Sequence, residues 1–242
     1  MKLIIDADSL VYESCYDVIT ADEALRKFQS KIKRIGDTFW TDDIELFLKG
    51  PENFRKVDFP LYKANRKSEA ESVVPELFSL LEEEEIGTQA EGCEADDLVR
   101  TRAHELDEPF TVVSIDKDLR CDPFRYYSPR NEVEQELTQK EADFNYYSQL
   151  LTGDSTDNIK GLNRVGPVTA AKLLAEPKEF RDIVIREYKE HFPTDYEDVL
   201  TFVGHLIHIK RNDNDWFDIG FGDFYDREVD IEKVGKLLRY DI

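Results

Sequence analysis

Short apolar runs alternate with amphipathic stretches over the first 151 residues. Buried parallel strands consist of such short apolar runs, whereas apolar residues at every third or fourth position are typical of covering helices. We expect strands at 3–5, 44–48, 87–90, 110–115 and 124–127. We expect helices at 21–35, 73–85 and 141–151. This alternation predicts an α/β fold with a mainly parallel sheet and helices on both faces.

After residue 174 the pattern is helical throughout, with helices expected at 180–188, 196–209 and 231–238. The chain shows no internal repeat and no low-complexity linker. We therefore expect an α/β domain over residues 1–151 and a smaller helical subdomain over residues 152–242 that packs on it.

Acidic residues gather where the predicted strands end. Asp6 follows the first strand directly, and an Asp-Lys-Asp sequence follows the strand at 110–115. A third group opens a helix beside Gly92, and a fourth places two aspartates three residues apart beside Gly153. Ligands of open α/β sheets bind at the carboxyl ends of strands, and so many carboxylates can share a pocket only if cations neutralise them. We therefore expect a site for hard divalent cations, with eight candidate ligands: Asp6, Glu94, Asp96, Asp97, Asp116, Asp118, Asp154 and Asp157.

Each of these acids also has a simpler explanation. Asp6 alone is equally well interpreted as a turn or helix cap, and acids in the first turn of a helix favour its initiation whatever the function. A lone Asp-x-Asp is typical of a surface turn. Three acids beside Gly92 exceed what a cap requires, however, and the strand before Asp116 favours a metal site there.

Two further stretches point to nucleic acid. Residues 54–67 hold five basic residues interleaved with aromatic ones, a combination that suits a strand-tracking surface, although a solvated helix face explains it too. The turn Val165-Gly166-Pro167 opens a short amphipathic helix, whose free backbone amides can bind a phosphate. A predicted metal site close to a predicted phosphate-binding turn suggests a nuclease.

The ordered motifs of the chain resemble a known family. They are Ile4-Ile5-Asp6, Phe54-Arg55, Tyr62-Lys63-Ala64-Asn65-Arg66, Glu94-Ala95-Asp96-Asp97, Asp116-Lys117-Asp118-Leu119, Gly153-Asp154 and the turn at Gly166. In this order they resemble the phage and bacterial 5'-to-3' exonucleases, or flap endonucleases, and the 5'-nuclease domain of bacterial DNA polymerase I. The resemblance implies a PIN-like nuclease domain, a helical arch near residues 54–72 and a helix-hairpin-helix.

The resemblance also implies cofactors and partners. It implies two Mg2+ or Mn2+ ions, K+ at the hairpin, and DNA with 5' ends, flaps or junctions as substrate. Lys63 and Arg55 would contact the scissile phosphate as catalytic residues. The DNA-binding candidates are Tyr62, Arg66, Lys67, Lys160, Arg164, Gly166, Thr169 and Lys172. The chain departs from the family pattern at Lys49, where an aspartate usually ends the second strand, and at Arg164, where glycine is frequent.

Charge is the main objection to a nucleic-acid partner. The net charge of −21 and the pI near 4.6 are opposite to the basic surface expected of a nucleic-acid-binding protein. We therefore interpret residues 55–67 as a local basic gate, a small basic surface for DNA on an otherwise acidic protein. Two alternatives stay open: a structure-specific DNA-binding protein whose site has decayed, and a ribonuclease acting on RNA or RNA–DNA hybrid.

The length of the apolar runs, the cysteines and two histidines lead to the remaining expectations. Apolar runs are too short to cross a bilayer, so we expect a cytoplasmic monomer without a membrane partner, in the host cytoplasm if a phage encodes it. The three cysteines are expected to be reduced and buried. His205 and His208 are interpreted as packing or surface residues rather than metal ligands.

Overall fold

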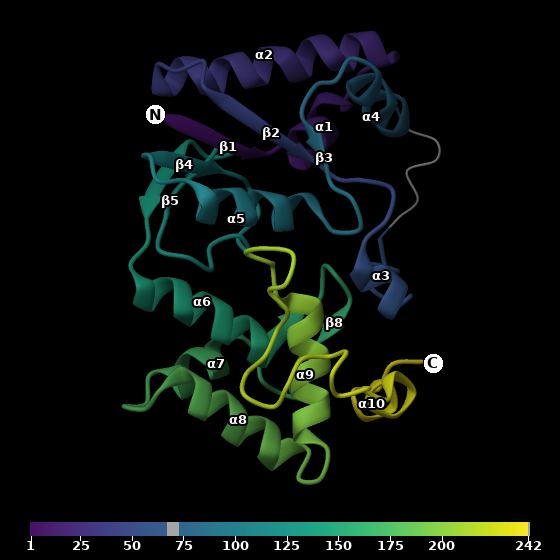
Figure 1. The fold of residues 1–242 in the computed structure, drawn as a ribbon, viewed down its shortest axis with the longest axis vertical. Helices are drawn as coiled ribbons and strands as arrows, with labels where there is room; N and C mark the ends of the chain where they lie inside the picture. The colour runs from purple at the N-terminus through teal and green to yellow at the C-terminus, as the bar shows by residue number, and fades with distance from the viewer. Residues whose placement is uncertain (67–72, 242) are drawn as a thin grey trace. The chain divides into compact units, whose positions relative to one another are not determined.

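The computed structural model describes residues 1–66 and 73–241, which form two compact units (Figure 1). The first, called the sheet unit, comprises residues 1–54 and 67–137. The second, called the helical unit, comprises residues 55–66 and 138–242. Lys67 and the predicted arch residues 68–72 lie outside the described residues.

A six-stranded sheet organises the sheet unit, in the order β3-β2-β1-β4-β5-β6. Strands β1 to β5 pair in parallel and β6 is antiparallel to β5. The strands are β1 (Lys2–Asp6), β2 (Ile44–Leu48), β3 (Thr88–Gln89), β4 (Phe110–Val113), β5 (Arg125–Ser128) and β6 (Val133–Glu136). The mainly parallel sheet predicted from the sequence is confirmed.

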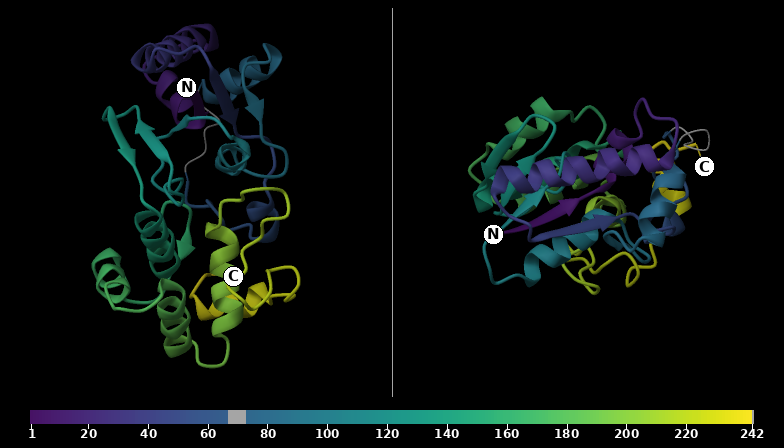
Figure 2. Two further views of the ribbon diagram at one scale, coloured as in Figure 1. Left: turned by 60° about the vertical axis from the view of Figure 1, so that its left-hand side comes forward. Right: turned by 90° about the horizontal axis from the view of Figure 1, so that it is seen from above.

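Helices cover both faces of this sheet, as Figure 1 shows for α2 and α5. The helices are α1 (Asp8–Ser14), α2 (Ala21–Phe39), α4 (Val74–Glu83) and α5 (Ala95–Glu105). Leu3 and Ile5 of β1 pack in one core with Phe28 of α2 and Leu77 of α4. Figure 2 shows α2 lying over β1 when the molecule is seen from above. Helix α5 packs against β1, β2 and β4. Among the described residues, no helix is both long and apolar enough to cross a membrane.

The helical unit has its own core. Its helices are α6 (Gln139–Thr152), α7 (Pro167–Leu174), α8 (Phe180–His191), α9 (Tyr196–Ile207) and α10 (Ile231–Leu237), together with residues 55–58 of α3 (Phe54–Asp58). A short hairpin of β7 (Gly153–Asp154) and β8 (Ile159–Lys160) links α6 to α7. Tyr188 is fully buried, and its hydroxyl donates to the carbonyl of Leu150 at 2.6 Å. Phe59 and Tyr62 belong to the same core.

The division between the units differs from the predicted one at residues 151 and 152, because α6 belongs to the helical unit. Leu150 and Leu151 on α6 are buried in the core that α8 and α9 share. Helix α6 packs against α7, α8 and α9, which holds residues 138–151 with the C-terminal helices.

Candidate active site

Four residues at the carboxyl edge of the sheet are linked by hydrogen bonds. Asp6 ends β1, and Ser114 follows the neighbouring strand β4. The Ser114 hydroxyl donates to Oδ2 of Asp6 at 2.8 Å and accepts from the backbone N–H of Asp116 at 2.9 Å. Oδ1 of Asp116 in turn accepts from the N–H of Asp118 at 2.9 Å. Ser114 was not predicted from the sequence, although a polar residue directly after an apolar strand and two positions before Asp116 was a signal for it.

Asp6 lies in an environment that disfavours its negative charge. Its side chain is buried, and burial together with the charges of Asp8 and Asp116 raises its pKa to about 7. The hydrogen bond from Ser114 acts in the opposite direction. A cation near Asp6 would therefore stabilise its charged form.

The acids that open α5 form a hydrogen-bonded cap. Asp97 is 2% exposed, and its Oδ2 accepts from the backbone N–H of Glu94 at 3.0 Å. Oδ1 of Asp96 accepts from the N–H of Asp97 at 2.8 Å. The capping explanation thus applies to Asp97, while the predicted metal roles of Glu94, Asp96 and Asp97 stay predictions.

The chemistry of these donors fits a hard divalent cation, because all of them are carboxylate oxygens. Within residues 1–66 and 73–241, however, no three His, Cys, Asp or Glu side chains are gathered into a ready metal site. The sheet edge therefore offers carboxylate oxygens that suit a divalent cation, and the negative charge of buried Asp6 would be stabilised by one. The described side chains do not form a complete set of metal ligands.

Lys49 follows β2, where the resemblance implies an aspartate. Its backbone N–H donates to Oδ1 of Asp8 at 2.8 Å. Its ammonium donates to the Tyr12 hydroxyl at 2.5 Å and lies 4.4 Å from the ring centroid of Phe78. These contacts stabilise the Lys49 charge on an aromatic pair.

The helical unit brings three of the predicted residues, Tyr62, Lys63 and Arg66, into contact with Asp157. Its Oδ2 accepts from the Tyr62 hydroxyl at 3.1 Å and lies 3.5 Å from Nζ of Lys63. Its Oδ1 forms an ion pair with Arg66. The backbone N–H of Lys63 also donates to the carbonyl of Asp157 at 2.9 Å. A predicted metal ligand thus holds two of the predicted phosphate-binding cations.

Asp154 shapes the turn before Asp157. Its side chain is buried, and its Oδ1 accepts from the N–H groups of Thr156 at 2.7 Å and Asp157 at 3.3 Å. Gly153 and Gly161 approach so closely that a Cβ on either would lie 2.3 Å from the backbone nitrogen of the other. The hairpin therefore requires glycine at both positions.

The prediction that Arg55 contacts a phosphate is not what the structure shows. Arg55 is 1% exposed, and its guanidinium donates to the carbonyls of Leu206 at 3.0 Å and His208 at 2.5 Å. These carbonyls lie at the C-terminal end of α9, where a cation is favourable. Burial leaves the guanidinium no surface for DNA, so the structure assigns Arg55 to packing.

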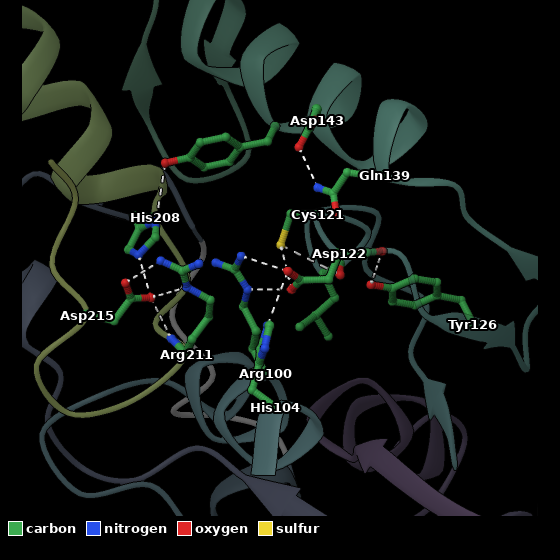
Figure 3. Close-up of polar contacts among 12 residues, drawn as sticks. Arg100, His104, Cys121, Asp122, Tyr126, Gln139, Asp143, His208, Arg211 and Asp215 are labelled. Carbon is green, nitrogen blue, oxygen red and sulfur yellow. Dashed lines mark hydrogen bonds and ion pairs between the residues drawn. The ribbon is translucent and has the colours of Figure 1, made fainter. Parts of the chain in front are cut away.

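The two histidines pack against carboxylates, in agreement with the sequence analysis. Nε2 of His205 is 2.8 Å from Oδ2 of Asp58. Nε2 of His208 is 2.9 Å from Oδ2 of Asp215, which also pairs with Arg211 (Figure 3). Of the three cysteines, Cys121 is buried as expected, whereas Cys15 and Cys93 are half-buried.

Four of the eight predicted DNA-binding residues lie at the surface in and after the turn before α7. Gly166 is the N-cap of α7. Arg164, Gly166, Thr169 and Lys172 are all exposed. Lys160 instead places its ammonium 4.4 Å from the ring centroid of Tyr240. A hollow of about 530 Å³ beside the hairpin is lined by Lys160, Arg164 and Arg239, among others.

Arg164 has φ of 64°, in the left-handed region that favours glycine. Arg164→Gly should therefore stabilise the protein by about 1 kcal/mol and raise the melting temperature by about 3 °C. Arg164→Ala retains the backbone strain and removes only the cation, so it serves as the matched control. If Arg164 contacts phosphate, both variants should weaken duplex binding equally in a fluorescence-anisotropy titration. An unchanged affinity in both would exclude that contact.

The sequence matches a known family over half of its length. The profile of the family described as 5'-3' exonuclease, N-terminal resolvase-like domain, matches residues 1–121. DNA polymerase I of Rhizobium leguminosarum is 32% identical over 146 residues, which cover 52% of this chain and 14% of the polymerase. The 5'-3' exonuclease of Buchnera aphidicola is 32% identical over 159 residues, 58% of this chain and 54% of that protein. Flap endonuclease Xni of Shewanella sediminis is 32% identical over 138 residues, 50% of this chain and 54% of that protein. The match thus spans about half of each exonuclease relative.

Solved structures share the fold. The zinc-bound 5'-exonuclease of bacteriophage T5 superposes with a TM-score of 0.57 at 17% identity, over 86% of this chain and 98% of that chain. The catalytic core of Rad2 in complex with DNA substrate gives a TM-score of 0.53 at 13% identity, over 98% of this chain and 86% of that chain. This chain belongs to the 5'-3' exonuclease family. The resemblance noted in the sequence is therefore confirmed.

Proposed function

We propose that this chain is a divalent-metal-dependent 5'-to-3' exonuclease and flap endonuclease that hydrolyses DNA phosphodiesters. The observation that carries the proposal is the linked arrangement of Asp6, Ser114 and Asp116, because a buried carboxylate beside further acids is stabilised by a cation. Family membership and the zinc in the phage T5 relative support the same chemistry.

The acids are proposed to hold two cations, Mg2+ or Mn2+. Bound cations of this kind lower the pKa of a water and neutralise charge on a phosphate. The proposed ligands are Asp6, Glu94, Asp96, Asp97, Asp116, Asp118, Asp154 and Asp157.

The basic residues bind the substrate in this proposal. Lys63 and Arg66, which lie against Asp157, stabilise the growing negative charge of the phosphate. Exposed groups at Gly166, Thr169 and Lys172 hold the duplex backbone without reading bases, with K+ as a further cation at that turn. The proposed substrates are DNA ends, flaps and junctions, as in phage replication or primer removal.

Metal removal tests the reaction directly. A 5'-labelled flap or recessed duplex should be cut in Mg2+ and remain intact in excess EDTA, because the acids repel phosphate unless cations neutralise them. Adding Mg2+ back should restore cleavage, which controls for irreversible unfolding. Equal cleavage in both conditions would overturn the metal mechanism. Blunt, nicked and RNA–DNA hybrid substrates in the same assay measure the substrate range, and cutting of the hybrid alone would favour the ribonuclease alternative.

A second candidate is a structure-specific DNA-binding protein with an impaired site. Lys49 favours it, because a cation follows β2 where the resemblance implies an acid. Tight flap binding without cleavage in either Mg2+ or Mn2+ would support this candidate over the nuclease.

A further inference from the structure

A buried ion pair joins the two acid-bearing segments of the sheet unit. Arg100 lies one helical turn after Asp96 on α5, and Asp122 lies four residues after Asp118. Nε of Arg100 is 2.6 Å from Oδ2 of Asp122, and Nη2 is 3.1 Å from Oδ1 (Figure 3). This two-point contact fixes the direction of both side chains as well as their distance.

Further contacts hold Asp122 in place. Nε2 of His104 lies 3.2 Å from its Oδ1, and the Tyr126 hydroxyl donates to its carbonyl at 3.0 Å. Burial alone would raise the pKa of Asp122, but hydrogen bonds from His104 and Arg100 lower it to about 2. The side chains of Arg100 and Asp122 are only 8% and 9% exposed. Asp122 is thus a buried, negatively charged side chain held by several contacts within the unit.

The ion pair is not explained by stability alone. Replacing a buried ion pair with apolar residues of similar size is often neutral or stabilising, because removing two charges from water is costly. Its distinctive property is orientation. Asp96, Arg100 and His104 follow one another at four-residue intervals, so they lie along one face of α5. A contact from that face to Asp122 fixes the rotation of α5 about its own axis. It also fixes the position of α5 along that axis relative to residues 116–122.

We propose that Arg100 and Asp122 are positioning residues that hold the carboxylates opening α5 in register with those following β4, so that both groups serve the same divalent cations. This inference rests on the proposed function. Neither residue is proposed to contact a cation, and both act through the acids one turn or four residues away.

The test replaces both charges at once. Arg100→Leu with Asp122→Leu removes the pair without leaving a single buried charge, so the protein should fold. We expect Mn2+ affinity, measured by electron paramagnetic resonance without DNA, to fall by about tenfold or more, as for other residues that orient metal ligands. The Mg2+ concentration for half-maximal cleavage should rise by a similar factor. If the double variant does not fold, Arg100→Lys retains the charge, loses the two-point contact and should shift Mn2+ affinity in the same direction.

A second two-point ion pair on the same helix, half-buried rather than buried, provides the control. Nε of Arg102 is 2.6 Å from Oε2 of Glu45, and Nη2 is 2.9 Å from Oε1, which ties α5 to β2 instead. Arg102→Leu with Glu45→Leu should change the melting temperature and leave Mn2+ affinity within about twofold, because the contact between Arg100 and Asp122 is kept.

The outcomes separate this inference from the proposed function. Wild-type cleavage together with unchanged Mn2+ affinity in folded Arg100 and Asp122 variants overturns the positioning pair alone. A wild-type protein that binds Mn2+ without cutting DNA overturns the nuclease, while weaker Mn2+ binding in the variants still supports the pair. A wild-type protein that binds no Mn2+ overturns both.

Discussion

Replacing Asp154 and Asp157 together by asparagine is expected to reduce cleavage by about three orders of magnitude or more. The exchange removes two proposed metal ligands and so weakens cation binding. DNA binding should persist and can become tighter, because two charges that repel phosphate are lost. Lys63 and Arg66 also lose the ion pairs that they form with Asp157.

The geometry of the turn indicates that this double variant will fold. Oδ1 of Asp154 accepts two backbone hydrogen bonds, and the asparagine oxygen can accept both. Binding should be measured in Ca2+ and cleavage in Mg2+ on one preparation, together with a melting curve.

A matched control exists in the same unit. Oδ1 of Asp223 accepts from the N–H groups of Tyr225 and Asp226, both at 2.9 Å. Asp223→Asn with Asp226→Asn therefore makes the same charge change in the same kind of turn, and it should leave cleavage near the wild-type rate. A folded Asp154 and Asp157 variant that also cuts near the wild-type rate would show that these aspartates only shape the turn.

Lys63→Ala should slow single-turnover cleavage by about a hundredfold or more, since a preorganised cation at the scissile phosphate acts mainly in the transition state. Duplex affinity should change little. Lys63 has φ of 57°, which alanine tolerates no better than lysine, so the change tests the ammonium rather than the backbone. Rapid-quench kinetics at saturating protein measure the bound complex directly.

Lys233→Ala is the control for losing a paired lysine. Nζ of Lys233 lies 2.5 Å from Oδ1 of Asp195 in the same unit, and its loss should leave the rate unchanged. If affinity collapses in Lys63→Ala while the bound complex cuts at the normal rate, Lys63 is only a backbone contact.

Strongly patterned elements could be predicted from the sequence, and weakly patterned ones could not. The strand predicted at 44–48 is β2 with the same bounds, and the helix predicted from residue 21 is α2. Strand β6 was missed because all four of its residues are exposed, so no apolar pattern marks it and pairing with β5 holds it. Helix α1 was missed because its seven residues are too few to show a helical period.

The candidate site shows a similar limit. Acid groups at strand ends could be found because parallel strands end at one edge. The roles within the basic segment could not, because Arg55 donates to carbonyls about 150 positions away, whereas Lys63 and Arg66 pair with Asp157. Basic residues in one short segment thus have different roles: Arg55 is buried, whereas Lys63 and Arg66 pair with a proposed metal ligand. Only the tertiary contacts distinguish them.

The helical unit is assembled from two stretches of chain that are distant in sequence, residues 55–66 and 138–242. Phe59 from the first stretch is 1% exposed and meets the rings of Phe202 and Tyr240 from the second, with centroids 5.0 Å and 4.9 Å apart. A fragment beginning at residue 138 would lack the Phe59 ring in its core. A fragment ending at residue 137 would expose Phe59 to water, because Phe202 and Tyr240 would be absent. The unit therefore cannot be excised or grafted as one contiguous segment, and chimaeras that exchange this unit must carry both stretches together.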